Sequence, residues 1–141
     1  MLKEKLENQH ESLSHDVPSG AYMCAEQLEF FRTLLAAEKS ALLNNVQKTL
    51  DQLQKLEAVP DSNDRASLEE EYLLELKVRD RERKLLKKID EALLRIEQGT
   101  YGWCSETGEP IGIGRLLARP TASLCVEAQE RHEMNDRLYD I

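Results

Sequence analysis

The sequence predicts a mainly α-helical protein in which a small globular module carries a long antiparallel coiled-coil hairpin. The 141 residues include 23 leucines but only seven aromatic residues, a balance that favours helices over sheets. Residues 21–98 contain no glycine and a single proline, Pro60. Five of the six glycines then fall between positions 99 and 114. Since glycine and proline disfavour helix interiors, we expect two long helices joined near Pro60 and a compact module after them.

A seam of apolar residues runs along each arm of the predicted hairpin. The first arm has Leu28, Leu35, Leu42, Val46, Leu53 and Leu56, and the second has Leu68, Tyr72, Leu86, Ile89, Leu93 and Ile96. These positions follow the heptad-like spacing of coiled coils. Polar residues interrupt both seams, namely Arg32, Lys39, Thr49, Glu75, Arg79 and Glu82. A single interrupted seam favours a two-helix hairpin over a thick bundle.

Three segments are expected along the chain. Residues 1–27 form an N-terminal segment that packs on the globular end. Residues 28–98 form the hairpin, with its tip near 59–67, where Pro60 ends the first arm because the residue before a proline avoids the α region. Residues 99–141 form the globular module, which begins at Gly99 as a left-handed helix cap. We expect short strands or turns around 111–117 and a last helix over 123–138.

The composition excludes several classes of protein. The net charge of −8 argues against direct binding to DNA or to anionic membranes, which need a basic surface. No run approaches the roughly 18 apolar residues of a membrane span, and no apolar stretch marks a secretory signal. Three cysteines without an export signal indicate the reducing cytoplasm. We therefore expect a cytoplasmic protein.

Charge is separated along the second half of the hairpin. Residues 61–75 hold six acids and one base, a net of −5, whereas residues 77–88 hold seven bases and two acids, a net of +5. One interpretation is a solvated helix with ion pairs between successive turns. The other is an acidic tip on a basic stem that enters a polar channel. Separation into blocks favours the second interpretation without deciding it.

The globular module carries an incomplete zinc-finger pattern. Cys104-x-x-Thr107 and Cys125-x-x-Ala128 stand where a four-thiolate site would have a cysteine at both ends of each turn. Threonine and alanine are not useful zinc ligands, and no histidine sits at ligand spacing. We therefore expect no structural zinc and no bound metal. The two thiols either stay reduced or form a disulfide.

The order of these motifs resembles the DksA/TraR family of bacterial RNA polymerase regulators. The resemblance covers about residues 21–133 and includes the hairpin turn, the basic stem and the globular module. The matching motifs are Pro60-Asp61-x-x-Asp64-Arg65-Ala66, Glu69-Glu70-Glu71, Arg79-Asp80-Arg81-Glu82-Arg83-Lys84-Leu85, Lys87-Lys88-Ile89, Tyr101-Gly102-x-Cys104, Ile111-Gly112-Ile113 and Ala118-Arg119-Pro120-Thr121-Ala122-x-Leu124-Cys125. The two missing cysteines are typical of the zinc-independent members of the family.

This resemblance implies a function that the residue pattern alone does not. Family members insert the hairpin into the secondary channel of RNA polymerase, destabilise open promoter complexes and act with the alarmone (p)ppGpp. They inhibit ribosomal RNA promoters and activate some biosynthetic promoters. The resemblance therefore implies a monomeric regulator that binds bacterial RNA polymerase. It implies neither sequence-specific DNA binding nor membrane binding.

The resemblance also assigns roles to particular residues. Asp61, Asp64 and Ala66 would form the hairpin tip near the polymerase active site. Arg81 and Lys88 would contact polymerase. Leu85, Lys88 and Arg119 would contribute to the (p)ppGpp site at the polymerase interface, where Gln129 replaces a basic residue of the family.

Two other classes of function remain open. A transcript-cleavage or elongation factor of the Gre kind would use its tip acids to position a catalytic Mg²⁺ inside polymerase. A plain coiled-coil scaffold or redox-sensing adaptor would have no polymerase partner. An enzyme in its own right is not expected, because no nucleophile–base pair or phosphate-binding loop is apparent.

Overall fold

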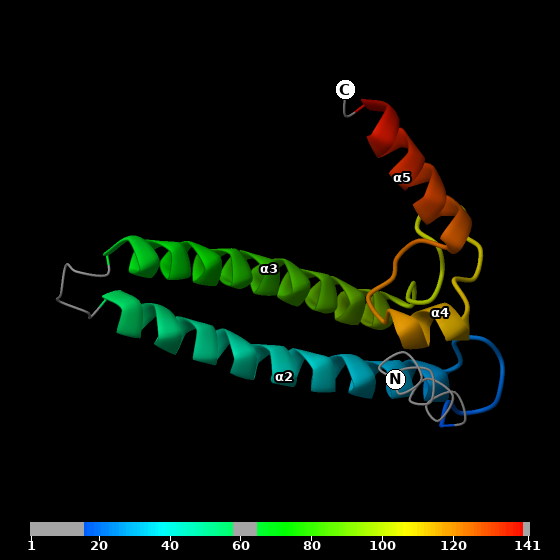
Figure 1. Ribbon diagram of the computed structural model, residues 1–141. Helices are drawn as coiled ribbons and strands as arrows, with labels where there is room; N and C mark the ends of the chain where they lie inside the picture. The colour runs from blue at the N-terminus through cyan, green and yellow to red at the C-terminus, as the bar shows by residue number, and fades with distance from the viewer. Residues whose placement is uncertain (1–15, 58–64, 140–141) are drawn as a thin grey trace, which may run out of the picture. The chain divides into compact units, whose positions relative to one another are not determined.

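The computed structural model describes residues 16–57 and 65–139. They form the four helices labelled in Figure 1, which are α2 (Ala25–Glu57), α3 (Arg65–Gln98), α4 (Ile113–Ala118) and α5 (Val126–Tyr139). The described residues contain no strand, only an isolated antiparallel bridge between Trp103 and Pro110. The predicted fold class, mainly helical with a long hairpin and a C-terminal helix, is confirmed. None of the described helices is long and apolar enough to span a membrane.

The chain divides into two compact units. The hairpin unit is residues 36–90, and the globular unit combines residues 1–35 with residues 91–141. The tip residues 58–64, which include Asp61 and Asp64, lie outside the described residues.

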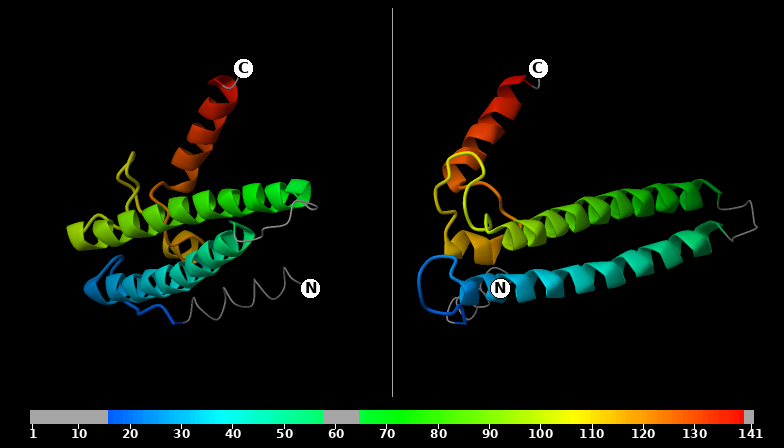
Figure 2. Two further views of the ribbon diagram at one scale, coloured as in Figure 1. Left: turned by 90° about the vertical axis from the view of Figure 1, so that its left-hand side faces the viewer. Right: turned by 180° about the vertical axis from the view of Figure 1, so that it is seen from behind.

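Within the hairpin unit, α2 and α3 lie side by side and antiparallel, as both Figure 1 and Figure 2 show. Three cross-helix contacts set their register. Lys39 Nζ lies 2.6 Å from Asp90 Oδ1, Thr49 Oγ1 lies 2.7 Å from Glu82 Oε1, and the Tyr72 hydroxyl donates to Glu57 Oε1 at 3.2 Å. As the residue number rises along α2, that of its partner falls along α3. Leu53 and Ile89, two of the predicted seam residues, are buried.

The core of the globular unit is built around Tyr101. Phe31, Leu35, Tyr101 and Leu116 are its largest fully buried side chains. The Tyr101 hydroxyl donates to the Pro120 carbonyl at 2.7 Å, and its ring lies 5.6 Å from that of Phe31. This cluster links the beginning of α2 to the loop after α3. Burial of each such ring stabilises the folded state by roughly 1.5–3 kcal/mol.

Tyr22 fastens the segment before α2 onto the same loop. Its hydroxyl donates to the Gly102 carbonyl at 2.5 Å and accepts from the Gly112 N–H at 2.9 Å. Gly102 has a φ of +87°, and a side chain there would lie 2.5 Å from the Met23 Cγ. Only glycine therefore allows this close approach.

The predicted cap at Gly99 is confirmed. Gly99 has a φ of +77°, and the N–H of Thr100 donates to the Arg95 carbonyl at 3.0 Å. This is the bond of a Schellman motif, which ends a helix by satisfying its last carbonyls. Helix α3 consequently stops at Gln98, where the sequence placed the end of the second arm.

One detail of the sequence analysis is wrong. The strands or turns expected at 111–117 are replaced by α4, whose first turn closes when the Leu116 N–H bonds the Gly112 carbonyl at 3.1 Å. Burial of Leu116 and Leu117 outweighs the strand preference of the isoleucines nearby. Trp103 is 38% exposed and stands edge-on to Tyr22, with ring centroids 5.2 Å apart.

Candidate functional site

The two cysteine turns of the globular unit lie together and are tied by backbone hydrogen bonds. In the first turn the Gly108 N–H donates to the Cys104 carbonyl at 2.9 Å, and the Cys104 N–H donates to the Glu109 carbonyl at 2.8 Å. The Ser105 N–H donates to the Ser123 carbonyl at 2.9 Å, which joins this turn to the segment before Cys125. Both thiols are free and buried. The finger-type turns therefore form in a chain that has only half of the usual thiolates.

Thr107 and Ala128 occupy the other two ligand positions. The Thr107 hydroxyl lies 3.9 Å from Cys125 Sγ and also hydrogen-bonds the sulfur of Cys104. Ala128 is fully buried at the start of α5. Thr107 thus bridges the two sulfurs by hydrogen bonds, and the Ala128 methyl group fills space where a fourth ligand would stand.

This donor set does not fit zinc. A structural zinc site needs four nitrogen, sulfur or oxygen ligands, most often thiolates or imidazoles. Among the described residues, no group of three or more His, Cys, Asp or Glu side chains is placed to hold a metal. The Nε2 of His132 pairs instead with the Glu106 carboxylate. Backbone hydrogen bonds, such as that of the Ser105 N–H to the Ser123 carbonyl, join the two described turns.

The environment of Cys104 favours its thiolate. Burial alone would raise the pKa of Cys104, but hydrogen bonds from the Thr107 hydroxyl and from the N–H groups of Cys125, Thr107 and Glu106 lower it to about 6. A negative sulfur that accepts several donors is a common way to stabilise a thiolate without metal.

We predict a thiolate titration near pH 6 that depends on Thr107. A cysteine in an unfolded chain has a pKa of ~8.5, so the lowered pKa of Cys104 contributes stability above that pH, and the contribution is lost as the pH falls through about 6. Thr107→Val should move the midpoint upward. The ultraviolet absorbance of thiolate, followed against pH, measures it. Cys104→Ser should remove the step near pH 6, and a step that survives this change would contradict the assignment.

The basic residues of the stem lie on α3 in the hairpin unit. Arg81, Leu85 and Lys88 are all exposed. Asp80 lies among them, but Lys84 and Arg83 approach its carboxylate at 3.1 and 2.9 Å, and these contacts lower its pKa. The acid is therefore paired within α3, which leaves Arg81 and Lys88 as bases without an ion pair among the described residues. Ala66 lies in the first turn of α3.

Arg119 belongs to the globular unit and is exposed directly after α4. Its backbone N–H donates to the Arg115 carbonyl at 2.8 Å at the end of that helix. Arg119 and Gln129 line one shallow pocket, together with Glu130 and Glu133. The Gln129 side chain donates to Glu133 Oε1 at 3.3 Å. Two of the residues assigned by resemblance to the alarmone region thus share a pocket of the globular unit.

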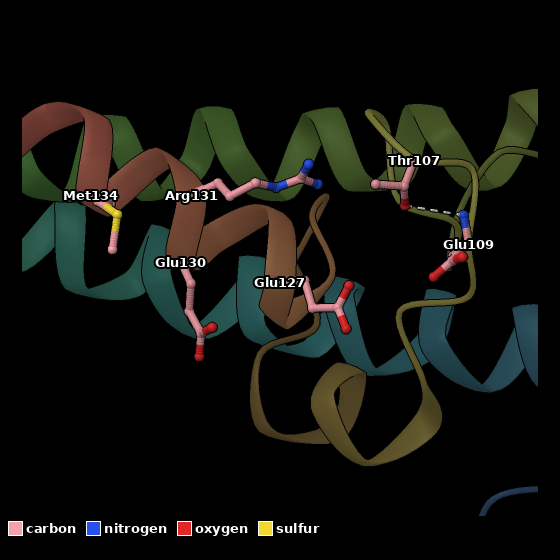
Figure 3. A pocket seen from close by; sticks show the side chains of 6 residues that line it. All are labelled: Thr107, Glu109, Glu127, Glu130, Arg131 and Met134. Atoms are coloured by element: carbon pink, nitrogen blue, oxygen red, sulfur yellow. Dashed lines mark hydrogen bonds between the residues drawn. The ribbon is translucent and has the colours of Figure 1, made fainter.

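The sequence analysis missed a groove between the first cysteine turn and α5. Figure 3 shows its lining side chains, with the Glu109 N–H donating to the Thr107 hydroxyl at 3.3 Å. The groove holds about 540 Å³ and is lined by Thr107, Glu109, Glu127, Glu130, Arg131 and Met134. The last four of these recur at three- and four-residue spacing along α5, and this periodicity in the sequence would have indicated a shared face. Nothing in the groove points to a particular ligand.

Fold and site together define a class of protein whose chain combines a helical hairpin with a small module that contains two cysteine turns. Known proteins identify the family. The model described as DnaK suppressor protein DksA, N-terminal domain, matches residues 27–96, and the prokaryotic dksA/traR C4-type zinc finger matches residues 99–133. The chain belongs to the DksA/TraR family. Its second part matches a family of four-cysteine fingers while offering two cysteines.

Named relatives are similar over most of their length. The RNA polymerase-binding transcription factor DksA of Caulobacter vibrioides is 52% identical over 127 residues, covering 89% of this chain and 87% of the relative. The Escherichia coli protein of the same name is 44% identical over 121 residues, covering 85% and 80%. The structure of transcription factor DksA2 from Pseudomonas aeruginosa superposes with a TM-score of 0.82 at 48% identity, covering 92% and 98%. These relatives are named as transcription factors rather than as enzymes.

Proposed function

We propose that this protein is a cytoplasmic, monomeric transcription regulator that binds bacterial RNA polymerase through its secondary channel. It destabilises open promoter complexes, inhibits ribosomal RNA promoters and activates some biosynthetic promoters together with (p)ppGpp. It acts without catalysing a reaction and without a structural zinc ion. The observation that carries the proposal is the match of both parts of the chain, hairpin and module, to one family in the same order.

The charge of the hairpin unit supports the role of α3 as the stem that contacts polymerase. Residues 77–88 carry a net charge of +5, and Arg81 and Lys88 are exposed. Residues 65–90 of α3 extend about 39 Å at ~1.5 Å per residue, so a helix of this size can follow the wall of a channel. Opposite charges on such a wall would speed and orient binding.

The tip acts separately from the stem in this proposal. Asp61, Asp64 and Ala66 approach the active-site region, where the two carboxylates hydrogen-bond a mobile element of polymerase. Two carboxylates on a turn provide few of the oxygen ligands that Mg²⁺ needs, which makes metal capture the weaker alternative. Should the carboxylates nonetheless position Mg²⁺, the protein would instead be a Gre-like cleavage factor.

The alarmone joins the complex at the polymerase interface, where Leu85, Lys88 and Arg119 contribute. A guanidinium binds phosphate oxygens through a two-pronged fork, and an ammonium acts as a point charge. Arg119 and Lys88 supply one of each. Gln129 offers a neutral amide at a position where the family has a base, which should weaken the coupling.

Transcription in vitro from a ribosomal RNA promoter tests the proposal, with and without (p)ppGpp and with and without a zinc chelator. We expect the protein to inhibit, (p)ppGpp to strengthen the inhibition, and the chelator to change nothing. Shortened RNA in a stalled elongation complex would favour the cleavage factor. Failure to bind core polymerase would favour a scaffold or redox adaptor.

Gln129→Lys should increase the response to (p)ppGpp. The new ammonium would line the same pocket as Arg119 and add a charge-assisted hydrogen bond of ~1.5 kcal/mol, which lowers the half-maximal (p)ppGpp concentration about tenfold. A (p)ppGpp titration of promoter inhibition measures this. Gln129→Leu serves as the uncharged control. An unchanged midpoint in the lysine variant would remove Gln129 from the alarmone region.

A further inference from the structure

Two polar interruptions of the apolar seams meet inside the hairpin unit. Thr49 Oγ1 lies 2.7 Å from Glu82 Oε1 and 3.0 Å from the Asn45 carbonyl oxygen. Glu82 is only 5% exposed, and among the side chains that the structure describes it is the only buried acid. Replacing such a buried polar pair with apolar residues is often neutral or stabilising. Stability alone therefore gives no reason for a carboxylate at this position.

The second oxygen of Glu82 lacks a partner. Oε2 is buried and makes no hydrogen bond to any described residue. Lys48 and Arg81 line the same groove, yet neither forms an ion pair with Glu82 among the contacts of the described residues. A carboxylate accepts up to about four hydrogen bonds, and a buried one without a counter-charge is costly. Glu82 is thus short of a cationic donor.

A groove between the helices leads to this carboxylate. It has a volume of about 540 Å³, with Thr49 and neighbouring residues of α2 on one side and Glu82 and its neighbours on α3 on the other. Leu42, Val78 and Leu85 supply apolar walls, and Glu75 adds a second acid one heptad before Glu82. The groove lies entirely within the hairpin unit.

We propose that this groove binds a lysine or arginine side chain of a protein partner, with Glu82 as the counter-charge. The apolar walls suit the methylene groups of a lysine or arginine side chain, whose charged end then reaches the Glu82 carboxylate. A divalent cation fits less well, because it requires six or more oxygen ligands. Nucleic acid fits less well because Glu75 and Glu82 repel phosphate.

The inference rests on the proposed function, in which the partner is RNA polymerase. Arg81, a proposed polymerase contact, lines the groove, so a polymerase segment against the stem would lie beside Glu82. The basic stem would then recognise acids on polymerase, while the groove recognises one base. Contacts of both signs fix the register of an interface more strictly than contacts of one sign.

Glu82→Gln tests the inference, because glutamine keeps the size and the Thr49 contact but removes the charge. Binding to core RNA polymerase is measured by competition at several salt concentrations, beside the thermal unfolding midpoint of the free protein. We expect about tenfold weaker binding, or ~1.4 kcal/mol, a shallower salt dependence, and a midpoint that is unchanged or higher. Asp51→Asn, an equal change of charge at an exposed position of α2, should bind as the wild type does.

Thr49→Val distinguishes binding of the partner from stability of the fold. It removes the hydrogen bond between Thr49 and Glu82 but keeps the Glu82 carboxylate. A loss of affinity confined to Glu82→Gln supports the inference. Equal losses in both variants, or wild-type affinity in Glu82→Gln, overturn it and leave the proposed function intact. Wild-type protein that does not bind polymerase at all overturns both.

Discussion

Asp64→Asn is expected to abolish inhibition of a ribosomal RNA promoter while binding to RNA polymerase stays within about twofold of the wild type. Asp61→Asn should act in the same direction. In the proposed function the tip carboxylates act on a polymerase element, whereas the stem supplies most of the affinity. A change at the tip therefore alters the effect of the bound protein more than the amount bound. Transcription in vitro and a binding competition, performed on the same samples, measure the two quantities.

Substitution by asparagine tests whether loss of inhibition results from loss of a helix cap. An aspartate just before α3 can also act as a helix cap, and asparagine and serine cap about as well as aspartate. Asp64→Asn and Asp64→Ser should therefore keep the thermal midpoint of the wild type while losing inhibition. Asp51→Asn, with the same change of charge on an exposed face of α2, should inhibit normally. Full inhibition by Asp64→Asn would show that the Asp64 carboxylate is not required for promoter inhibition.

The hairpin could be predicted because its determinants are local. Residues 21–98 contain no glycine and one proline, and this absence of helix-disfavouring residues predicts two long helices joined near Pro60. Gly99 ends α3 with a positive φ. Glycine adopts this conformation more readily than other residues, so the end of the helix is predictable from the residue type. Seam residues such as Leu35 and Ile89 could be selected by periodicity, and both are buried.

Features that depend on tertiary contacts could not be predicted in the same way. Thr49 and Glu82 were both visible as polar interruptions, but periodicity does not give the register that brings them within 2.7 Å. Helix α4 forms because Leu116 and Leu117 are buried in the core. Local helix propensity does not predict this burial. The edge-on contact of Trp103 with Tyr22, 81 positions earlier, likewise depends on the fold.

The candidate site shows the same division. The spacing Cys104-x-x-Thr107 and Cys125-x-x-Ala128 is readable in the sequence, and so is the loss of two zinc ligands. The contacts that Thr107 makes with the two cysteines cannot be predicted from this spacing. The contact of the Thr107 hydroxyl with both sulfurs, and the backbone donors around Cys104, require the fold. Only with these groups in place does the thiolate at Cys104 have a physical cause.

Restoring the missing cysteines should create a zinc site. Wild-type protein is expected to contain well under one zinc per chain and to keep its thermal midpoint in a chelator. Thr107→Cys with Ala128→Cys should bind one zinc per chain. At free zinc about a thousandfold above Kd, binding adds ~4 kcal/mol and raises the midpoint by roughly 10 °C. Metal analysis and thermal unfolding, each with and without chelator, check both proteins.

The geometry already approaches what the metal needs. Four sulfurs ~2.3 Å from a zinc ion stand ~3.8 Å apart at the corners of a tetrahedron, and the Thr107 hydroxyl lies 3.9 Å from Cys125 Sγ. Ala128 is fully buried, so the extra sulfur should destabilise the zinc-free double variant by ~1–3 kcal/mol. Thr107→Cys alone, with three thiolates, should bind zinc more weakly. A wild-type protein that holds one tight zinc and unfolds in chelator would refute the hydrogen-bonded description of these turns.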